Sequence, residues 1–404
     1  MPAALRRLIW VRALFTAAVQ MQAVLLGWRM YDLTHDPLHL GLIGLTEAIP
    51  ALSLALYAGY LVDRRTPLKI YRWVVAVSLL SATIMVVSQL PALQLAPALQ
   101  VQALYLAAFA TGLGRAFAQP SVYAIVPQLV PRAQLARAAA AMAAALQAAR
   151  IGGPAVGGLL FGWLGIGPSG ALVWLLLVMA LLVLRGIGPL PRVAPLAAAG
   201  SPLQELLAGA RFVFAHPVLL PAMLLDMLSV LFAGVTALLP IFAAEILGVG
   251  PSGLGLLRAA PAIGAAFTSL WLARIDIGPR AGAWLFGAVT GFGVCILGFG
   301  LSQTLWLSLL LLAMSGACDS VSMVIRSAAV QLASPEALRG RISAVNAIFI
   351  GSSNELGEFE SGLAAWWLGA TAAVVGGGGV CLLTVAVVAL MAPALRRLDL
   401  QVET

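Results

Sequence analysis

Acidic side chains lie inside long apolar segments of this 404-residue chain, where an ionised group is costly. The chief ones are Asp226, Asp319, Glu355 and Glu358, with Glu360 close behind. A charge at membrane depth costs at least about 2.5–3.5 kcal/mol unless it faces protein or water. These carboxyl groups are therefore expected to line an aqueous route, to pair with bases, or to be partly protonated.

Other polar residues recur at intervals of three or four, which places each set on one face of a helix. The sets are Thr111, Arg115 and Gln119; Gln147 and Arg150; Ser315, Asp319, Ser322 and Arg326; and Asn354, Glu358 and Ser361. Arg115 lies deep in its segment, so it must face protein or water and not lipid.

The elements that carry these residues are predicted to be membrane helices. Hydrophobic residues make up 62% of the chain, charged residues 9%, and the mean hydropathy is +1.01, which a soluble surface could not sustain. A bilayer core needs roughly 20 apolar residues per helix. We predict an all-α membrane protein with twelve transmembrane helices, at about 9–31, 40–62, 70–90, 98–122, 138–163, 169–185, 217–243, 252–273, 281–301, 304–327, 341–364 and 370–392.

The net charge of +8 reports topology. With the N-terminus inside, Lys and Arg fall in the cytoplasmic segments and almost none in the outer loops, as the positive-inside rule requires. Both termini are therefore expected in the cytoplasm, and no nucleic-acid partner is expected. The first apolar segment contains Gln20 and Gln22 and no cleavage site follows it, so it is expected to remain attached.

A long repeat divides the chain in two. The stretch from Gly112 to Gly165 returns as Gly316 to Gly369, at a constant offset of 204 residues. This offset indicates one ancestral half used twice. We predict two pseudo-symmetric six-helix bundles at 1–186 and 217–404, joined by a cytoplasmic linker with an interfacial helix at 187–216. Glycines and tryptophans are kept across the repeat, whereas Arg115, Arg150 and Pro154 are replaced by Asp319, Asn354 and Glu358.

The sequence DLTHDPLHL brings Asp32, His35, Asp36 and His39 close together, in a spacing that could imitate metal ligands. Asp36-Pro37 is better explained as a helix start. No metal and no cofactor are expected. The chain has no nucleotide-binding loop and no nucleophile beside a histidine, so it is not expected to be an enzyme.

Three motifs resemble the major facilitator superfamily. The loop with Gly59, Asp63, Arg64 and Arg65 is similar to the superfamily's cytoplasmic gate, although an ordinary basic loop would also account for it. Arg115 matches a membrane-embedded arginine of the fourth helix. The third motif resembles the fifth-helix signature of exporters, for which tight packing and a direct role in coupling are both open; its residues are Gly153, Pro154, Gly157 and Gly158.

Two longer stretches, WRMYDLTHDPLHLGLIGLTEAIPALSLALYAGYLVDRR and RISAVNAIFIGSSNELGEFESG, look like the bacterial branch that includes the enterobactin exporter, also called transmembrane secretion effectors. The resemblance implies a proton-driven secondary transporter that exports a small molecule across the inner membrane, and we expect a monomer. A siderophore-like substrate is expected; macrolide or multidrug efflux is the alternative, followed by a receptor or scaffold that moves no solute.

The resemblance also implies that Gln20, Gln22, Arg115, Asp226 and Asp319 line the cavity. We expect Gln119, Arg150 and Asn354 to contribute to it. For Gln20 and Gln22, a hydrogen bond to a neighbouring helix is the other reading. One or more of Asp226, Asp319, Glu355 and Glu358 is expected to carry the proton, with Arg115 or Arg150 influencing its release.

Overall fold

The computed structural model describes residues 1–188, 202–275, 278–335 and 338–400, and these residues form helices. The helices are α1 (Ala3–Thr34), α2 (Pro37–Ser53), α3 (Ala55–Arg64), α4 (Pro67–Ser88), α5 (Pro97–Leu129), α6 (Leu135–Leu164), α7 (Ile166–Arg185), α8 (Pro202–Ala215), α9 (Leu219–Ala233), α10 (Leu239–Ile241), α11 (Gly250–Leu272), α12 (Ala281–Leu301), α13 (Leu305–Ala333), α14 (Arg339–Leu368), α15 (Ala370–Met391) and α16 (Pro393–Arg396). The all-α class predicted from the apolar segments is confirmed for the described part of the chain.

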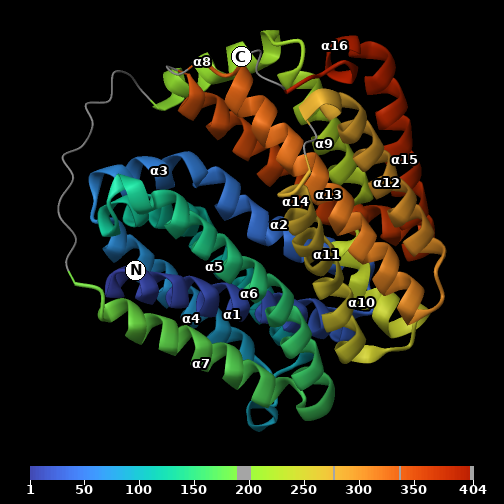
Figure 1. Cartoon of the computed structure of the whole chain (residues 1–404). Helices are drawn as coiled ribbons and strands as arrows, with labels where there is room; N and C mark the ends of the chain where they lie inside the picture. The colour runs from blue at the N-terminus through green and yellow to red at the C-terminus, as the bar shows by residue number, and fades with distance from the viewer. Residues whose placement is uncertain (189–201, 276–277, 336–337, 401–404) are drawn as a thin grey trace. The chain divides into compact units, whose positions relative to one another are not determined.

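The helices form two compact units (Figure 1). Unit 1 comprises Met1–Ala198 and Ala243–Ala259, and unit 2 comprises Ala199–Phe242 and Ala260–Thr404. In unit 1, α1 packs on α6 and α7, and α4 packs on α5 and α7. In unit 2, α9 packs on α14 and α15, and α12 packs on α13 and α15. The same set of helix pairs is therefore built once in each unit.

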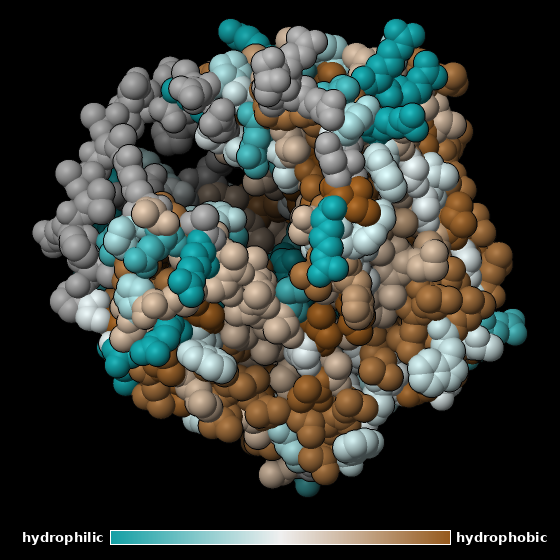
Figure 2. Space-filling view, in the orientation of Figure 1, coloured by the Kyte–Doolittle hydropathy of each residue, from teal (hydrophilic) through white to brown (hydrophobic). Residues whose placement is uncertain are grey.

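Eight described helical segments are long and apolar enough to cross a membrane. They are Ala3–Thr34, Pro67–Ser88, Ile166–Arg185, Leu219–Ile246, Gly250–Leu272, Gly278–Leu301, Leu305–Ala333 and Ala370–Met391. The other long helices, α5, α6 and α14, carry polar residues along their length. Hydrophobic residues cover much of the visible surface formed by α12, α13 and α15 (Figure 2). The number of twelve spans stays a prediction.

Two expected spans are interrupted. The segment predicted at 40–62 is divided at Leu54 into α2 and α3, one turn after Pro50. The segment predicted at 217–243 ends as an α-helix at Ala233, because Gly234 adopts φ −75° and ψ 105°. The hydroxyl of Ser361 donates to the carbonyl oxygen of Gly234 at 2.6 Å. The hydropathy of a segment does not report such breaks, since the residues after them are equally apolar.

Repeated glycines mark equivalent helix contacts in the two units. A Cβ at Gly112 would lie 2.1 Å from the carbonyl oxygen of Glu47 and 2.7 Å from Pro50 Cγ, where α5 crosses α2. At Gly316, where α13 crosses α11, a Cβ would lie 2.0 Å from the carbonyl oxygen of Pro261. Only glycine allows backbones to approach this closely.

The same holds at the next repeated positions. A Cβ at Gly153 would lie 2.8 Å from the carbonyl oxygen of Ala17, between α6 and α1. At Gly357, a Cβ would lie 2.9 Å from the carbonyl oxygen of Leu231, between α14 and α9. The glycines kept at the offset of 204 residues therefore have a common packing role.

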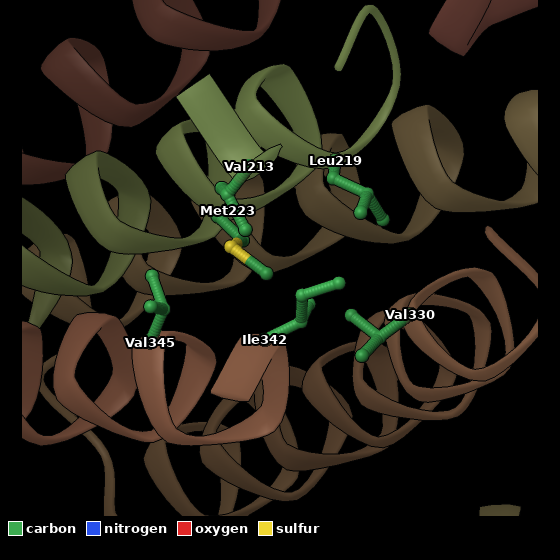
Figure 3. Close-up of a cluster of buried hydrophobic side chains, with 6 residues drawn as sticks. All are labelled: Val213, Leu219, Met223, Val330, Ile342 and Val345. Carbon is green, nitrogen blue, oxygen red and sulfur yellow. The ribbon is translucent and has the colours of Figure 1, made fainter. Parts of the chain in front are cut away.

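Helix α8 lies in the linker predicted at 187–216, where an interfacial helix is expected. It begins at Pro202, and most of the linker before it lies outside the described residues. Its inner face joins a buried cluster within unit 2, shown in Figure 3: Val213, Leu219, Met223, Val330, Ile342 and Val345. Leu207 and Phe214 remain exposed on α8. An amphipathic helix of this kind can lie in the membrane interface while its other face holds it to the bundle.

Candidate transport site

A buried ion pair joins α9 to α13 inside unit 2. Arg326 Nη1 lies 2.6 Å from Asp226 Oδ2, and the side chains are 6% and 8% exposed. The Arg326 Nε also donates to Ser322 Oγ at 3.2 Å. Asp319 interacts electrostatically with both members of the pair. One guanidinium thus interacts with two carboxyl groups, and this cluster carries one more acid than base.

Two of the acids predicted to carry the proton, Glu355 and Glu358, lie on α14. Glu355 is buried and Glu358 is half-buried. Asn354 is exposed, and its amide donates to the carbonyl oxygen of Ile350 at 2.8 Å. Their part in proton transfer and in lining a cavity stays a prediction.

The polar residues that come together in unit 1 are mostly basic, in contrast to the acidic cluster of unit 2. Arg115 Nη1 on α5 lies 2.6 Å from Glu47 Oε1 on α2, with side-chain exposures of 44% and 17%. Arg12 Nη2 on α1 donates to Gln119 Oε1 at 2.5 Å. Both arginines act electrostatically on Arg150 of α6. Three guanidinium groups with one adjacent carboxylate therefore form a basic surface within this unit, which we call the arginine cluster (Arg12, Arg115 and Arg150).

The two glutamines of α1 differ. Gln22 is buried, and its amide donates to Ser81 Oγ at 2.7 Å and to Thr111 Oγ1 at 3.3 Å. These bonds tie α1 to α4 and α5, as the packing interpretation expects. Gln20 is half-buried, and its Cβ lies beside Gly153.

The expected gate lies at the end of α3. The guanidinium of Arg64 stacks over the Tyr60 ring, 4.3 Å from its centroid, and Arg65 is exposed. The side chain of Asp63 lies outside the described residues. A Cβ at Gly59 would meet no atom within 4 Å in this structure. The role of the loop as a gate stays a prediction.

The Gly-Pro motif of α6 is a packing element in this structure. The helix continues through Pro154. A Cβ at Gly157 would lie 3.1 Å from Met21, and one at Gly158 would lie 2.5 Å from Gly255 Cα and 2.6 Å from the carbonyl oxygen of Pro251. These glycines let the backbone of α6 come into contact with the backbones of α1 and of the first turns of α11. The contacts agree with the tight-packing interpretation of the motif, and a direct role in coupling stays a prediction.

The metal-like spacing near residue 35 is resolved into other contacts. Asp36 caps α2 by accepting from the backbone N–H of Leu38 at 2.9 Å, as the helix-start interpretation predicted. Asp32 pairs with Arg29, and His39 contacts the Tyr105 hydroxyl at 2.6 Å. Among the described residues, no group of three or more metal-binding side chains is placed to hold an ion.

Three residues of these clusters were not assigned to the site from the sequence: Glu47, Arg12 and Arg326. Arg326 shares the helix face of Asp319, so its spacing was a usable signal. Glu47 is an acid within an apolar segment, but its partner Arg115 lies 68 positions away in the sequence. The sequence contains no sign of the bond between Arg12 and Gln119.

Comparison with known proteins agrees with this arrangement. The family model described as "Transmembrane secretion effector" matches residues 2–403. The enterobactin exporter EntS of Escherichia coli O1:K1 / APEC is 30% identical over 179 residues. That match covers 44% of this chain and 41% of EntS, so it spans less than half of either protein.

Solved transporters share the fold at low identity. A bacterial homologue of the iron transporter ferroportin, in an inward-facing state, superposes with a TM-score of 0.73 at 18% identity, over 97% of this chain and 98% of the homologue. A POT family transporter in complex with 5-aminolevulinic acid superposes with a TM-score of 0.76 at 14% identity, over 98% and 97%. The chain is a multi-pass membrane transporter, and it belongs to the transmembrane secretion effector family of the major facilitator superfamily.

Proposed function

We propose that this transporter exports a small acidic molecule across the bacterial inner membrane in exchange for protons. The observation that carries the proposal is the cluster of Asp226, Asp319 and Arg326 in unit 2. Energy from an ion gradient requires a group that gains and loses charge at membrane depth, and this cluster has one carboxylate more than it has bases.

The proton step follows from the charge count. With both carboxylates ionised, the cluster has a net charge of −1, and one proton neutralises it. A proton on Asp226 would weaken its bond to Arg326, since the guanidinium would lose its anionic partner and turn to Asp319. Protonation would thereby loosen the link between α9 and α13, which is the differential interaction that a coupled transition needs.

The arginine cluster supports an acidic substrate. Guanidinium groups bind carboxylates and related planar oxygen anions through two parallel hydrogen bonds. Glu47 and Gln119 hold Arg115 and Arg12 in place. A siderophore-like molecule with acidic oxygens fits this surface, and EntS, a relative, is named for the export of enterobactin. An amphiphilic cation, the expected cargo of the multidrug alternative, would be repelled.

The test is transport into liposomes that contain the purified protein. Enterobactin, a macrolide and an amphiphilic cation are each offered with and without an imposed pH gradient. We expect gradient-dependent transport of the acidic compound, lost in Asp226→Asn and Asp319→Asn. Asp32→Asn, an exposed acid at the end of α1, serves as the control and keeps transport. Unchanged transport in both cluster variants, or preference for the cation, contradicts the proposal.

We further propose that both termini lie in the cytoplasm, with the loop after α3 and the connection between α11 and α12 on the same side. The excess of arginine in these connections supports this topology. Single-cysteine variants at Arg65 and at Gln94, on opposite ends of α4, should differ in labelling by a thiol reagent that cannot cross the membrane. Equal labelling of both in intact cells argues against it.

A further inference from the structure

A groove of about 530 Å³ lies in unit 2, on the side where α11 ends and α12 begins. Its floor is formed by small or apolar residues of α12 and α13, namely Ala283, Gly287, Ala288, Ala317, Cys318 and Val321. Its rim carries Trp271, Trp284 and Arg280. Neither the cluster at Asp226 nor the arginine cluster takes part in it.

The rim has the composition of a membrane interface. Trp271 and Trp284 are 46% and 40% exposed, and their rings meet edge to face at a centroid distance of 6.0 Å. Arg280 is exposed at the residue just before α12 begins. Tryptophan and arginine at a helix end sit at the level of the lipid headgroups, with the apolar helix below them.

The depth of the groove matches part of one lipid leaflet. The eight residues of α12 between Arg280 and Ala288 rise about 12 Å along the helix axis. Half of a bilayer core of about 30 Å is about 15 Å. An acyl chain whose headgroup lies beside Arg280 would therefore run along the floor of the groove for most of its leaflet.

We propose that this groove binds one anionic phospholipid, with its phosphate at Arg280 and an acyl chain on the floor formed by Gly287, Ala288 and Val321. The charge of the occupant follows from Arg280, the charged residue among the described residues of the lining. Basic pockets between membrane helices hold anionic headgroups in this way. The chemistry below the rim excludes a polar partner, because the floor offers apolar surface.

Gly287 allows a direct test of the acyl-chain part. A Cβ there would meet no atom within 4 Å, so Gly287→Leu can add a side chain to the lining of the groove without a clash at its first atom. Gly291, one turn further, would bring a Cβ to 2.8 Å from Cys318 Sγ and is unsuitable. Ala283→Leu, on an exposed turn of the same floor, repeats the test should Gly287→Leu fail to fold.

Arg280→Gln tests the headgroup part, with Arg274→Gln as the matched control. Arg274 is exposed in the same connection but does not line the groove. The purified full chain is titrated with phosphatidylglycerol and with phosphatidylcholine of identical acyl chains, and bound lipid is counted by native mass spectrometry. One basic residue near the surface contributes about 1 kcal/mol to anionic lipid binding, which is about fivefold in affinity.

We expect the wild type and Arg274→Gln to prefer phosphatidylglycerol, and Arg280→Gln to lose about fivefold of that preference. Gly287→Leu should weaken binding of both lipids. Equal losses in the two arginine variants, or no loss in Gly287→Leu or Ala283→Leu, would mean annular lipid only and would overturn the proposal. Lipid binding is measured without transport, so the result tests this proposal independently of the proposed function.

Discussion

Arg326 and Asp226 form a salt bridge of 2.6 Å between α13 and α9, with both side chains more than nine-tenths buried. A buried pair of this kind contributes little net stability, but removal of one member leaves the other as an uncompensated buried charge. The pair therefore stabilises one arrangement of two helices as long as both charges are present.

Replacement of Arg326 should lower the stability of unit 2 more than replacement of Asp226. Arg326→Gln leaves Asp226 and Asp319 together without a base, and we expect it to destabilise unit 2 by about 3–5 kcal/mol. Asp226→Asn should cost less, because Asp319 still faces the guanidinium. Thermal unfolding of the detergent-solubilised variants measures which of the two is less stable, with Asp32→Asn as the control. An Arg326→Gln variant as stable as the wild type would refute the role of the pair.

Neighbouring glycines of α6 should respond in opposite directions to the same change. Gly153→Ala puts a methyl group 2.8 Å from the carbonyl oxygen of Ala17, so we expect a loss of about 1–3 kcal/mol. Gly152→Ala meets open space and should stabilise the helix by up to about 1 kcal/mol. Melting temperatures of the two variants decide the point, and an equal shift for both would contradict the contact with α1.

The arginine cluster predicts that substitutions of Arg115 and of Glu47 change substrate affinity in opposite directions. Arg115→Gln removes a positive charge and should raise the KM for an acidic substrate about tenfold, by the loss of a hydrogen bond to a charged group. Glu47→Gln removes the ion pair with Arg115 and should lower that KM. Initial transport rates in liposomes across substrate concentrations test both, with Glu245→Gln as a control acid elsewhere in unit 1. A KM that moves the same way in both variants is inconsistent with the cluster.

His216 should make stability depend on pH. Its Nδ1 accepts from the backbone N–H groups of Val218 and Leu219, both at 3.2 Å, at the start of α9. Burial lowers the pKa of His216 below its ordinary 6.5. The unfolded chain therefore takes up the proton first, so this contribution is complete above pH 6.5 and is lost as the pH falls below it.

The measurement is the melting temperature between pH 8 and pH 5. His216→Asn retains a cap that does not titrate, and its curve should fall less than that of the wild type. His35→Asn, at a residue with φ 51° that asparagine tolerates, should keep the wild-type dependence. Parallel curves for His216→Asn and the wild type would show that another group controls the effect.

Periodicity predicted which residues share a helix face but not which helices meet. The spacing of Asp319, Ser322 and Arg326 placed them together on α13, and the structure agrees. Their partner Asp226 lies about 100 positions earlier, on α9, and single-helix patterns contain no information on such contacts. The same limit applies to Glu47 and Arg115.

Breaks in helices were also beyond the reach of hydropathy. Gly234 ends α9 because its carbonyl group turns to Ser361 of α14, which is a tertiary contact. The repeated glycines were a stronger signal. Gly112, Gly153, Gly316 and Gly357 were visible in the sequence as conserved positions of the internal repeat, and each one lies where two backbones touch.

Gly112 has one further effect. The atom that its missing side chain would strike is the main-chain oxygen of Glu47, the residue whose carboxylate reaches Arg115 one turn further along α5. Any substituent at position 112 must push α2 outward and carry that carboxylate with it. The size of residue 112 therefore governs the distance between the charges of Glu47 and Arg115, although residue 112 itself contacts neither charged group.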